Sequence, residues 1–381
     1  MRIKKSIAIF FLLTALLLFA AGCTLSQAPA VGGSSSRPGT GGEAEGAADK
    51  LSVVCTIFPQ YDFVRQIAGD RVELTMLIRP GGDVHYYEPT PQDIIDIYDC
   101  DLFIYVGGES DSWADRILES AASDDLEGLS MMEYSGRIPE ETEEGMWDSH
   151  VHEAAGGGDD DGGSGSGNSG GSSDSEDDGG SGSEDDGRRG SRDGGVSGEE
   201  QETEYDEHVW TSVDNSIAIV SEICSRLCRL DPEGKSYYRQ RTEEYIFQLR
   251  ELKKSFEDVV QNAQTKTIVF GDRFPFLYFA KEYGLDYKAA FKGCASNSEA
   301  GAETVAYLID FVRERKIPVV FKLELSSGNI AQAIGEATGA EVRTFYSCHN
   351  LSKEDFENGE TYVSMMRKNV ESLEEALGGG A

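Results

Sequence analysis

The feature that most limits the possible folds is an alternation of short apolar segments with helix-like segments, which begins at residue 51. LSVVCTI (residues 51–57) is apolar and β-branched, and the helical pattern PQYDFVRQIAGD follows it. RVELTMLI and DLFIYVGG are two further strand-like stretches. Between them, Thr90 and Pro91 have the residue types of a helix N-cap and a first helical position. This β-α-β-α order predicts a parallel sheet covered by helices, and therefore an α/β fold.

A long helix is predicted at residues 236–262, where apolar residues recur at helical spacing over an unusually long stretch. Beyond it, TKTIVF, PVVFKLEL and AEVRTFY are predicted strands, separated by the helical patterns FPFLYFAKEYG, AETVAYLIDFVRERK and GNIAQAIGEATG. We therefore predict two similar lobes, each with a parallel, helix-covered sheet, joined by this one long helix. The N-terminal lobe takes residues 51–235 and the C-terminal lobe residues 265–381.

Residues 1–22 have the pattern of an export signal: a positively charged start, an apolar run at residues 7–19 and small residues before Cys23. The apolar run is short for a membrane-spanning helix. The segment resembles a bacterial lipoprotein signal, which implies cleavage before Cys23 and lipid attachment to its sulfur. The alternative is a plain signal peptide with an incidental cysteine. Residues 23–50, rich in Ser, Gly, Ala and Pro, are predicted to be a flexible tether on the outer face of the cytoplasmic membrane.

The net charge of −35 argues against nucleic acid or an anionic membrane surface as a binding partner. More than half of this charge lies in residues 141–207, which hold 22 acidic and 3 basic residues. We predict an insertion at about residues 147–205 within the N-terminal lobe. Its centre, residues 156–198, has almost no apolar residues, and we expect it to be disordered. Two interpretations stay open for this insertion: an arm that captures divalent cations, or a solvated tether.

The chain has only five histidines, and each is predicted to lie in or beside a loop at a strand end. His85 follows RVELTMLI, His208 begins the ordered sequence after the insertion, and His349 follows AEVRTFY. His150 and His152 stand in DSHVHEA at the edge of the insertion. Loops at the carboxyl ends of strands are where α/β sheets bind ligands. Any one histidine alone would most simply be a surface residue, but the shared placement indicates a metal site.

Three motifs, PGGDVHYYEPTPQD, DEHVW and FGDRFPFLYFAKEYGL, occur in this order. Together they resemble the metal-binding lipoproteins of zinc and manganese ABC importers, of the ZnuA/AdcA zinc type, from residue 51 to about residue 377. In that family, the histidines that match His85 and His208 bind the ion between two lobes, and a rigid helix links the lobes. The resemblance implies an extracytoplasmic receptor whose partners are an ABC permease and its ATPase. We expect a monomer, anchored to the membrane through Cys23.

The sequence departs from the usual family pattern at several positions. Gly271 stands where the family usually has a ligand histidine or glutamate, and YSCHNLS stands where an aspartate ligand often follows a late strand. The insertion is acidic rather than histidine-rich, which leaves His150 and His152 as candidate accessory ligands. We hypothesise that His349 supplies the third imidazole. Asp272, Glu324 and water are candidates for the fourth ligand. Glu88 either orients an imidazole or caps the following helix.

Three imidazoles favour zinc, whereas carboxylates and carbonyls favour manganese. Three histidines with a carboxylate or water give a tetrahedral site with bond lengths of about 2.0–2.1 Å. We therefore predict that the chain carries Zn²⁺, with Mn²⁺ as the alternative cargo. Ligands drawn from two lobes allow release, because separating the lobes removes part of the coordination shell. Imidazole binds metal only when neutral, so affinity should fall as the pH drops through about 6.5.

The main rival interpretation is an extracellular three-histidine zinc hydrolase, in which Glu88 or Glu324 acts as the base. The chain lacks both the H-E-x-x-H motif and the G-x-S-x-G nucleophile elbow, and we predict that it is not an enzyme. An adhesin and a receptor for an organic solute are further alternatives.

Six cysteines follow Cys23, and in an extracytoplasmic protein such residues can pair. They are Cys55, Cys100, Cys224, Cys228, Cys294 and Cys348. Their connectivity cannot be read from sequence. Cys224 and Cys228 are at helical spacing, where core packing is favoured over a thiol pair or half of a metal site.

Overall fold

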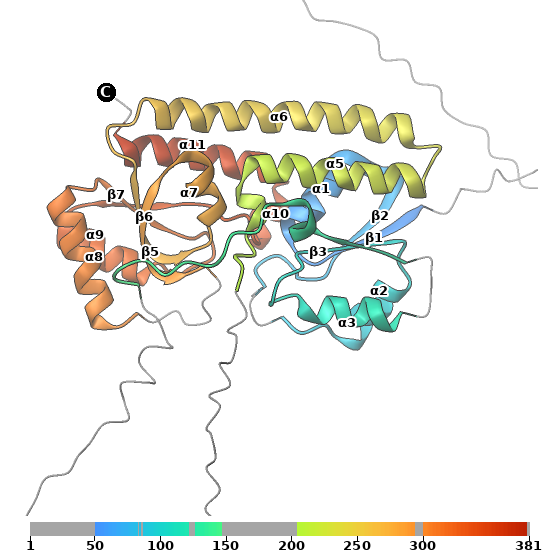
Figure 1. Cartoon of the computed structure of the whole chain (residues 1–381), viewed down its shortest axis with the longest axis horizontal. Coiled ribbons are helices and arrows are strands. Elements are labelled where there is room, and N and C mark those ends of the chain that lie inside the picture. The colour runs from blue at the N-terminus through green and yellow to red at the C-terminus, as the bar shows by residue number, and fades with distance from the viewer. Residues whose placement is uncertain are drawn as a thin grey trace, which may run out of the picture. The chain divides into compact units, whose positions relative to one another are not determined.

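Two separate four-stranded sheets, one in each half of the chain, confirm the predicted α/β class with two similar lobes (Figure 1). The computed structural model describes residues 50–82, 84, 87–121, 126–146, 204–293 and 300–378. All neighbouring strands in both sheets are parallel. None of the helices in these ranges is long and apolar enough to cross a bilayer.

The N-terminal sheet has the strand order β2-β1-β3-β4. Its elements are β1 (Leu51–Cys55), α1 (Phe58–Ala68), the 3₁₀ helix η1 (Gly69–Arg71), β2 (Val72–Met76), α2 (Pro91–Tyr98), β3 (Leu102–Tyr105), α3 (Ser112–Ser120), β4 (Glu127–Ser130) and η2 (Met131–Tyr134). Strand β3 reads LFIY and is buried at every position, because helices cover both faces of a parallel sheet. Helix α2 begins as predicted: Thr90 Oγ1 accepts a hydrogen bond from the Asp93 backbone N–H, and Pro91 is the first helical residue.

The C-terminal sheet repeats this arrangement with the order β6-β5-β7-β8. Its elements are β5 (Thr267–Phe274), α7 (Leu277–Tyr283), β6 (Asp286–Lys292), α8 (Ala302–Arg315), β7 (Val319–Lys322), α9 (Asn329–Thr338), β8 (Glu341–Thr344), α10 (Lys353–Glu357) and α11 (Tyr362–Leu377). The register between β5 and β6 shifts between Phe270 and Arg273. Such a bulge bends a strand and redirects its side chains, and here it lies at the carboxyl end of β5.

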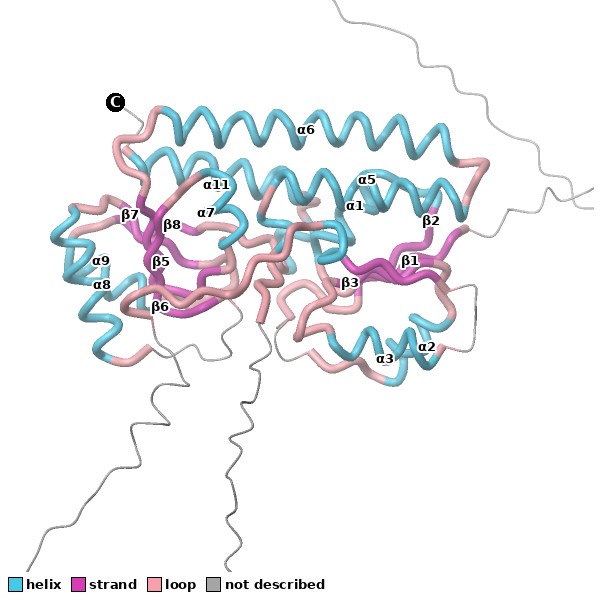
Figure 2. The backbone as a smooth tube through the Cα atoms, viewed as in Figure 1, coloured by secondary structure: helices cyan, strands magenta, loops and turns pink. Residues whose placement is uncertain are grey.

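Three helical segments connect the sheets: η3 (Val209–Thr211), α5 (Val213–Leu230) and the long α6 (Lys235–Gln261). Helix α6 runs along both lobes, with α5 and α11 beneath it (Figure 2). Its buried residues form one apolar stripe with steps of three or four positions: Tyr238, Thr242, Tyr245, Leu249, Leu252, Phe256 and Val260. Tyr245 meets Phe63 of α1 at a ring-centre distance of 6.1 Å, and Phe256 meets Phe279 of α7 at 4.9 Å. One helix face therefore holds both lobes.

Several elements were not predicted from the sequence, namely α3, β4, α5, β6, α10 and α11. Strand β4 reads EGLS and β6 reads DYKAAFK, and neither has the β-branched apolar run that identified the other strands. Both are held by pairing with a buried neighbouring strand, β3 and β5 respectively, which is a tertiary contact.

The cysteines of the described residues are all free thiols. Cys55, Cys100, Cys224 and Cys348 are buried, and Cys228 is half-buried. The Sγ atoms of Cys224 and Cys228 lie 3.9 Å apart on α5, and Cys224 belongs to the main apolar core. Cys294 lies outside the described residues. Packing therefore accounts for the buried cysteines.

Replacing Phe256 by alanine should lower the free energy of unfolding by about 3–5 kcal/mol, because it leaves a cavity between α6 and α7. Phe247→Ala on the same helix is the matched control. Its side chain is 63% exposed, so the change should stay within about 0.5 kcal/mol. Denaturant unfolding of both variants would measure this; equal losses would contradict the packing role of the stripe.

Candidate metal centre

A pocket of about 840 Å³ lies at the carboxyl ends of β5, β7 and β8. Parallel strands bring their carboxyl ends to one edge of a sheet, and the loops beyond them form the ligand site of an α/β fold. Asp272, Glu324 and His349 reach the pocket from these three strand ends. Gly81, Gly82, Val84 and His208 reach it from the part of the chain that precedes α6. The pocket therefore gathers residues from both sides of the long helix in the sequence.

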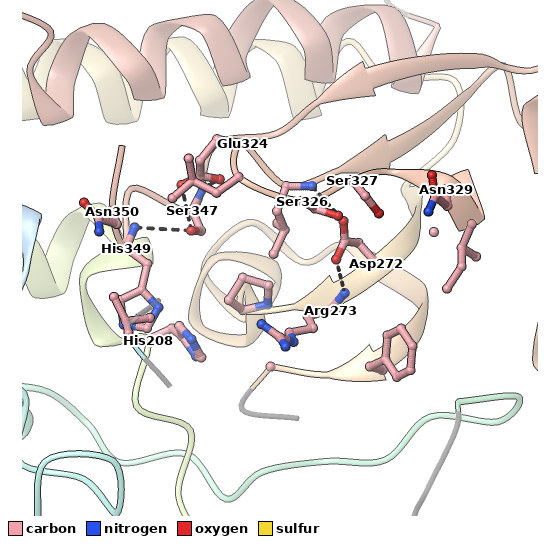
Figure 3. Close-up of a pocket in the computed structure, with 18 of the residues that line it drawn as sticks. His208, Asp272, Arg273, Glu324, Ser326, Ser327, Asn329, Ser347, His349 and Asn350 are labelled. Carbon is pink, nitrogen blue, oxygen red and sulfur yellow. Dashed lines mark hydrogen bonds between the residues drawn. The ribbon is translucent and has the colours of Figure 1, made fainter. Parts of the chain in front are cut away.

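His208 and His349 lie side by side in this pocket (Figure 3). Their ring centres are 5.2 Å apart and their planes are at 89°. Two imidazoles that share one tetrahedral zinc, with Zn–N distances of about 2.0–2.1 Å, have ring centres about 5 Å apart. The structure thus brings together two of the three predicted ligands. Among the described residues, no third histidine, cysteine, aspartate or glutamate completes a metal cluster with them.

The remaining predicted histidines, His85, His150 and His152, lie outside the described residues, as does the predicted lipidation site Cys23. The sequence neighbours of His85 are described in part. Val84 lines the pocket, and so does Gly82, three positions before the histidine.

His208 is 1% exposed and has a carboxylate beside it. Asp206 Oδ1 lies 3.3 Å from His208 Nδ1 and accepts a hydrogen bond of 2.8 Å from the His208 backbone N–H. Burial lowers the pKa of His208, but the charges of Asp206, Glu207 and Glu140 and the Asp206 hydrogen bond raise it above its usual value overall. A carboxylate at this distance from Nδ1 favours a proton on that nitrogen, which leaves the Nε2 lone pair for a metal ion, as in metal-binding histidines.

Local structure holds His208 at the N-cap of η3. Thr211 Oγ1 donates to the His208 carbonyl at 2.8 Å, and Tyr278 Oη donates to the Asp206 carbonyl at 2.9 Å. The expectation that every histidine lies beside the end of a strand was wrong for His208, which precedes a helical turn. His349 does follow β8 as expected.

Ser347 holds the loop that carries His349 through hydrogen bonds to Glu324 and to the His349 backbone. The Ser347 backbone N–H and Oγ donate to the two carboxylate oxygens of Glu324, both at 2.9 Å, and the His349 backbone N–H donates to Ser347 Oγ at 3.2 Å. Burial raises the pKa of Glu324 to about 7.

Trp210 Nε1 donates to the Ser347 carbonyl at 2.8 Å, and its ring centre lies 4.8 Å from that of His349 and 5.4 Å from that of His208. Trp210 is therefore a fully buried platform behind both imidazoles.

The other predicted candidates are placed differently around the pocket. Asp272 Oδ1 accepts from the Arg273 N–H at 2.9 Å and Oδ2 from the Leu323 N–H at 3.1 Å, so this carboxylate joins the ends of β5 and β7. Glu88 is exposed and lines a different pocket, beside Thr90. It does not cap α2, since Asp93 makes the reciprocal hydrogen bonds with Thr90.

Gly271 cannot be replaced by a ligand residue in this fold. A Cβ atom there would lie 2.4 Å from the Cα atom of Ala331 on α9. The close approach of α9 to β5 therefore requires glycine, and any side chain at this position is excluded.

Sequence analysis did not identify Asp206, Trp210 or Asn350 as site residues. The motif DEHVW held a signal for the first two, since a carboxylate and an indole flank the histidine. Asn350 gave no local signal, because its partners are about 270 residues away in the chain: its Nδ2 donates to the carbonyls of Arg79 and Gly82.

The family model of ZnuA, the periplasmic component A of a zinc-uptake complex, matches residues 53–376. Among similar proteins, the high-affinity zinc uptake system protein ZnuA of Bacillus subtilis is 27% identical, over 89% of this chain and 91% of its own length. The zinc-binding lipoprotein AdcA of Streptococcus pneumoniae is 26% identical over 86% of this chain, but the match spans only 56% of AdcA.

Among solved structures, the Zn(II)-bound ZnuA-like domain of Streptococcus pneumoniae AdcA has the same fold. Its TM-score is 0.61 at 23% identity, and the match covers 86% of this chain and 99% of that domain. The family model spans most of the chain and both lobes. This chain therefore belongs to the ZnuA family of zinc-uptake components.

Proposed function

We propose that this chain is an extracytoplasmic receptor that binds Zn²⁺ between its two lobes and delivers it to an ABC importer. The proposal rests on the distance between the ring centres of His208 and His349, which matches that of two imidazoles bound to one tetrahedral ion. Family membership supports it, since relatives are named for zinc uptake and zinc binding. His85, whose neighbours Gly82 and Val84 line the same pocket, is the proposed third ligand.

We assign the fourth coordination position to water. Asp272 and Glu324 both line the pocket, but each uses both carboxylate oxygens to hold backbone or hydroxyl groups of neighbouring loops. Their role is then to position the loops around the ion. A set of imidazoles and water suits zinc better than manganese, which prefers carboxylate and carbonyl oxygen.

The same contacts argue against the hydrolase alternative. A catalytic zinc site needs a general base near the metal-bound water. Glu324 is bonded to Ser347 through both oxygens, and Glu88 lines a different pocket. A binding role therefore fits the described residues better than a catalytic one.

The surrounding parts of the chain complete the proposed receptor. A lipid on Cys23 would hold it at the outer face of the cytoplasmic membrane, beside its permease and ATPase, as a monomer. His150 and His152 would bind zinc weakly at the edge of the acidic insertion. Deleting residues 156–198 and measuring uptake at limiting zinc would separate a capture arm from a solvated tether.

Replacing a ligand histidine should weaken zinc binding strongly. We expect His85→Ala, His208→Ala and His349→Ala each to lower the affinity by more than about 100-fold, since even residues that only orient a ligand contribute about 10–100-fold. Chelator competition on purified protein would measure this. The double variant His150→Ala/His152→Ala is the control and should keep the tight site; wild-type affinity in any of the three single variants would remove that residue from the site.

Asp206→Asn should lower zinc affinity by about 10–100-fold, because the carboxylate that orients the His208 ring is lost. Glu204→Gln changes an exposed carboxylate two positions earlier and should have little effect. Both affinities can be measured in the same competition assay. An Asp206 variant that binds like the Glu204 control would show that His208 is not oriented by this pair.

Zinc affinity should fall with decreasing pH, because only neutral imidazole binds the metal. The pKa of His208 is raised above its usual value, so its proton competes with zinc from a pH above about 6.5 downward. When the pH is lowered from 8 to 5, the dissociation constant for zinc should therefore increase, and the increase should already begin before the pH has fallen to about 6.5. A constant affinity down to pH 5 would exclude histidine ligands.

A further inference from the structure

A buried asparagine joins two loops that both line the pocket. We propose that Asn350 is a positioning residue that fastens the segment leading into His85 to the loop carrying His349, and that this contact opens when the ion is released. The inference rests on the proposed zinc-receptor function. Asn350 belongs to the C-terminal lobe, beyond β8, and its partners belong to the N-terminal lobe, beyond β2.

The contact uses the whole amide group of Asn350. Its Nδ2 donates to the carbonyls of Arg79 at 3.0 Å and Gly82 at 2.9 Å, and its Oδ1 accepts from the Leu351 N–H at 2.9 Å. Beside it, the Gly81 N–H donates to the Leu351 carbonyl at 2.8 Å. We call these interlobe bonds, from Asn350 Nδ2 and from Gly81, the latch. The Asn350 residue is only 3% exposed, whereas its partners Arg79 and Gly81 are exposed and Gly82 is half-buried.

The chemistry of the latch is specific to an amide side chain. Two carbonyls need two donated hydrogens, and the Leu351 N–H needs an acceptor on the same group. Aspartate offers no donor, serine offers one, and alanine none. Losing the side chain removes the Asn350 donor from both carbonyls, and the Arg79 carbonyl then keeps the hydrogen bond from the Gly82 N–H at 2.9 Å. The two bonds between the lobes are lost, which loosens the contact.

The latch lies next to the proposed ligands on both sides. Asn350 is adjacent to His349, and Gly82 is three positions before His85. Gly81, Gly82 and Asn350 all line the pocket that holds His208 and His349. A change in the distance between the two loops therefore changes the distance between ligand-bearing segments.

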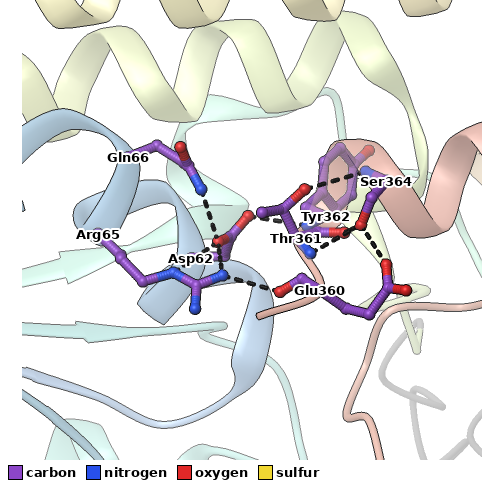
Figure 4. A network of polar contacts seen from close by, with 7 residues as sticks. All are labelled: Asp62, Arg65, Gln66, Glu360, Thr361, Tyr362 and Ser364. Atoms are coloured by element: carbon purple, nitrogen blue, oxygen red, sulfur yellow. Dashed lines mark hydrogen bonds and ion pairs between the residues drawn. The ribbon is translucent and has the colours of Figure 1, made fainter. Parts of the chain in front are cut away.

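A second contact between the lobes lies away from the pocket and has a different role. Asp62 of α1 accepts from the Tyr362 N–H at the start of α11 at 2.8 Å, and the neighbouring Arg65 donates to the Glu360 carbonyl at 2.8 Å (Figure 4). Helices α1 and α11 both pack on α6. The Trp210 Nε1–Ser347 carbonyl bond also joins the lobes beside the pocket. Separation of the lobes at the pocket therefore breaks that bond together with the latch, whereas the network of Asp62 and Arg65 on the α6 side is left as the pivot.

Asn369 of α11 provides a matched control, because its side chain holds Tyr346 in the loop that leads to His349. It is fully buried, its Oδ1 accepts from the Tyr346 N–H at 2.7 Å, and its Nδ2 donates to the Tyr346 carbonyl at 2.8 Å. Both bonds stay inside the C-terminal lobe. Asn369→Ala therefore removes a comparable buried amide without cutting a contact between the lobes.

The experiment measures zinc release from the full chain after mixing with excess chelator. Asn350→Ala should release zinc about 10–100 times faster than wild type, and Asn350→Ser, which keeps one donor, should fall between them. Asn369→Ala should lower thermal stability while releasing zinc at close to the wild-type rate. Equal release from Asn350→Ala and wild type, or equally fast release from both alanine variants, would overturn the inference.

Hydrogen exchange of the wild-type protein provides a test that does not depend on how the variants fold. The Gly81 amide should exchange slowly in zinc-loaded protein and at least about tenfold faster after zinc removal, because the latch opens with release. Equal exchange in the two states would overturn the inference. Wild-type protein that binds no zinc would instead overturn the proposed function, which the zinc titration before mixing reveals separately.

Discussion

The apolar stripe of α6 is the interaction on which the rest of the structure depends. The two lobes do not share a sheet, because each has its own sheet of four strands. The stripe packs on α1 at Tyr245 and on α7 at Phe256, so a single rigid element sets how the lobes are spaced. One apolar core continues beneath the pocket, because buried residues of both lobes, among them Phe58, Trp210 and Phe345, belong to a single cluster. The loops at the pocket therefore meet above a core that α6 and both lobes share.

The predictable part of the fold is the part with local signals. The β-branched runs that became β1, β3 and β7 and the helical spacing that became α6 were visible in the sequence, because a buried strand or an apolar helix face imposes a period on its own residues. Strands β4 and β6 imposed no such period. EGLS and DYKAAFK are strands because a buried neighbouring strand offers them backbone hydrogen bonds. Which strand becomes the neighbour depends on the tertiary structure and cannot be read from the segment itself.

The site shows the same division. Histidine is rare in this chain and chemically distinctive, so His208 and His349 could be selected from composition and position, and the structure places them together. The groups that hold them have common residue types. Asp206 is one acidic residue among many, and Asn350 acts on carbonyls 271 and 268 positions earlier in the chain. Sequence reasoning finds ligands by their chemistry, whereas the residues that position ligands are defined by contacts that only the folded chain creates.

The location of negative charge around the pocket bears on how a divalent ion can be both held and released. Asp206 and Glu207 are buried beside His208, where they raise its pKa and favour a nearby cation. Asp272 and Glu324 are fastened to backbone groups of neighbouring loops. The negative charges that attract the ion are therefore mainly those of carboxylates beside His208, and the groups proposed to bind the ion directly are neutral imidazoles. A carboxylate bonded directly to the ion would have to be separated from it at a high electrostatic cost in a sheltered pocket. Imidazole ligands backed by fixed carboxylates lower that cost, because on release the buried charges keep their own hydrogen-bond partners.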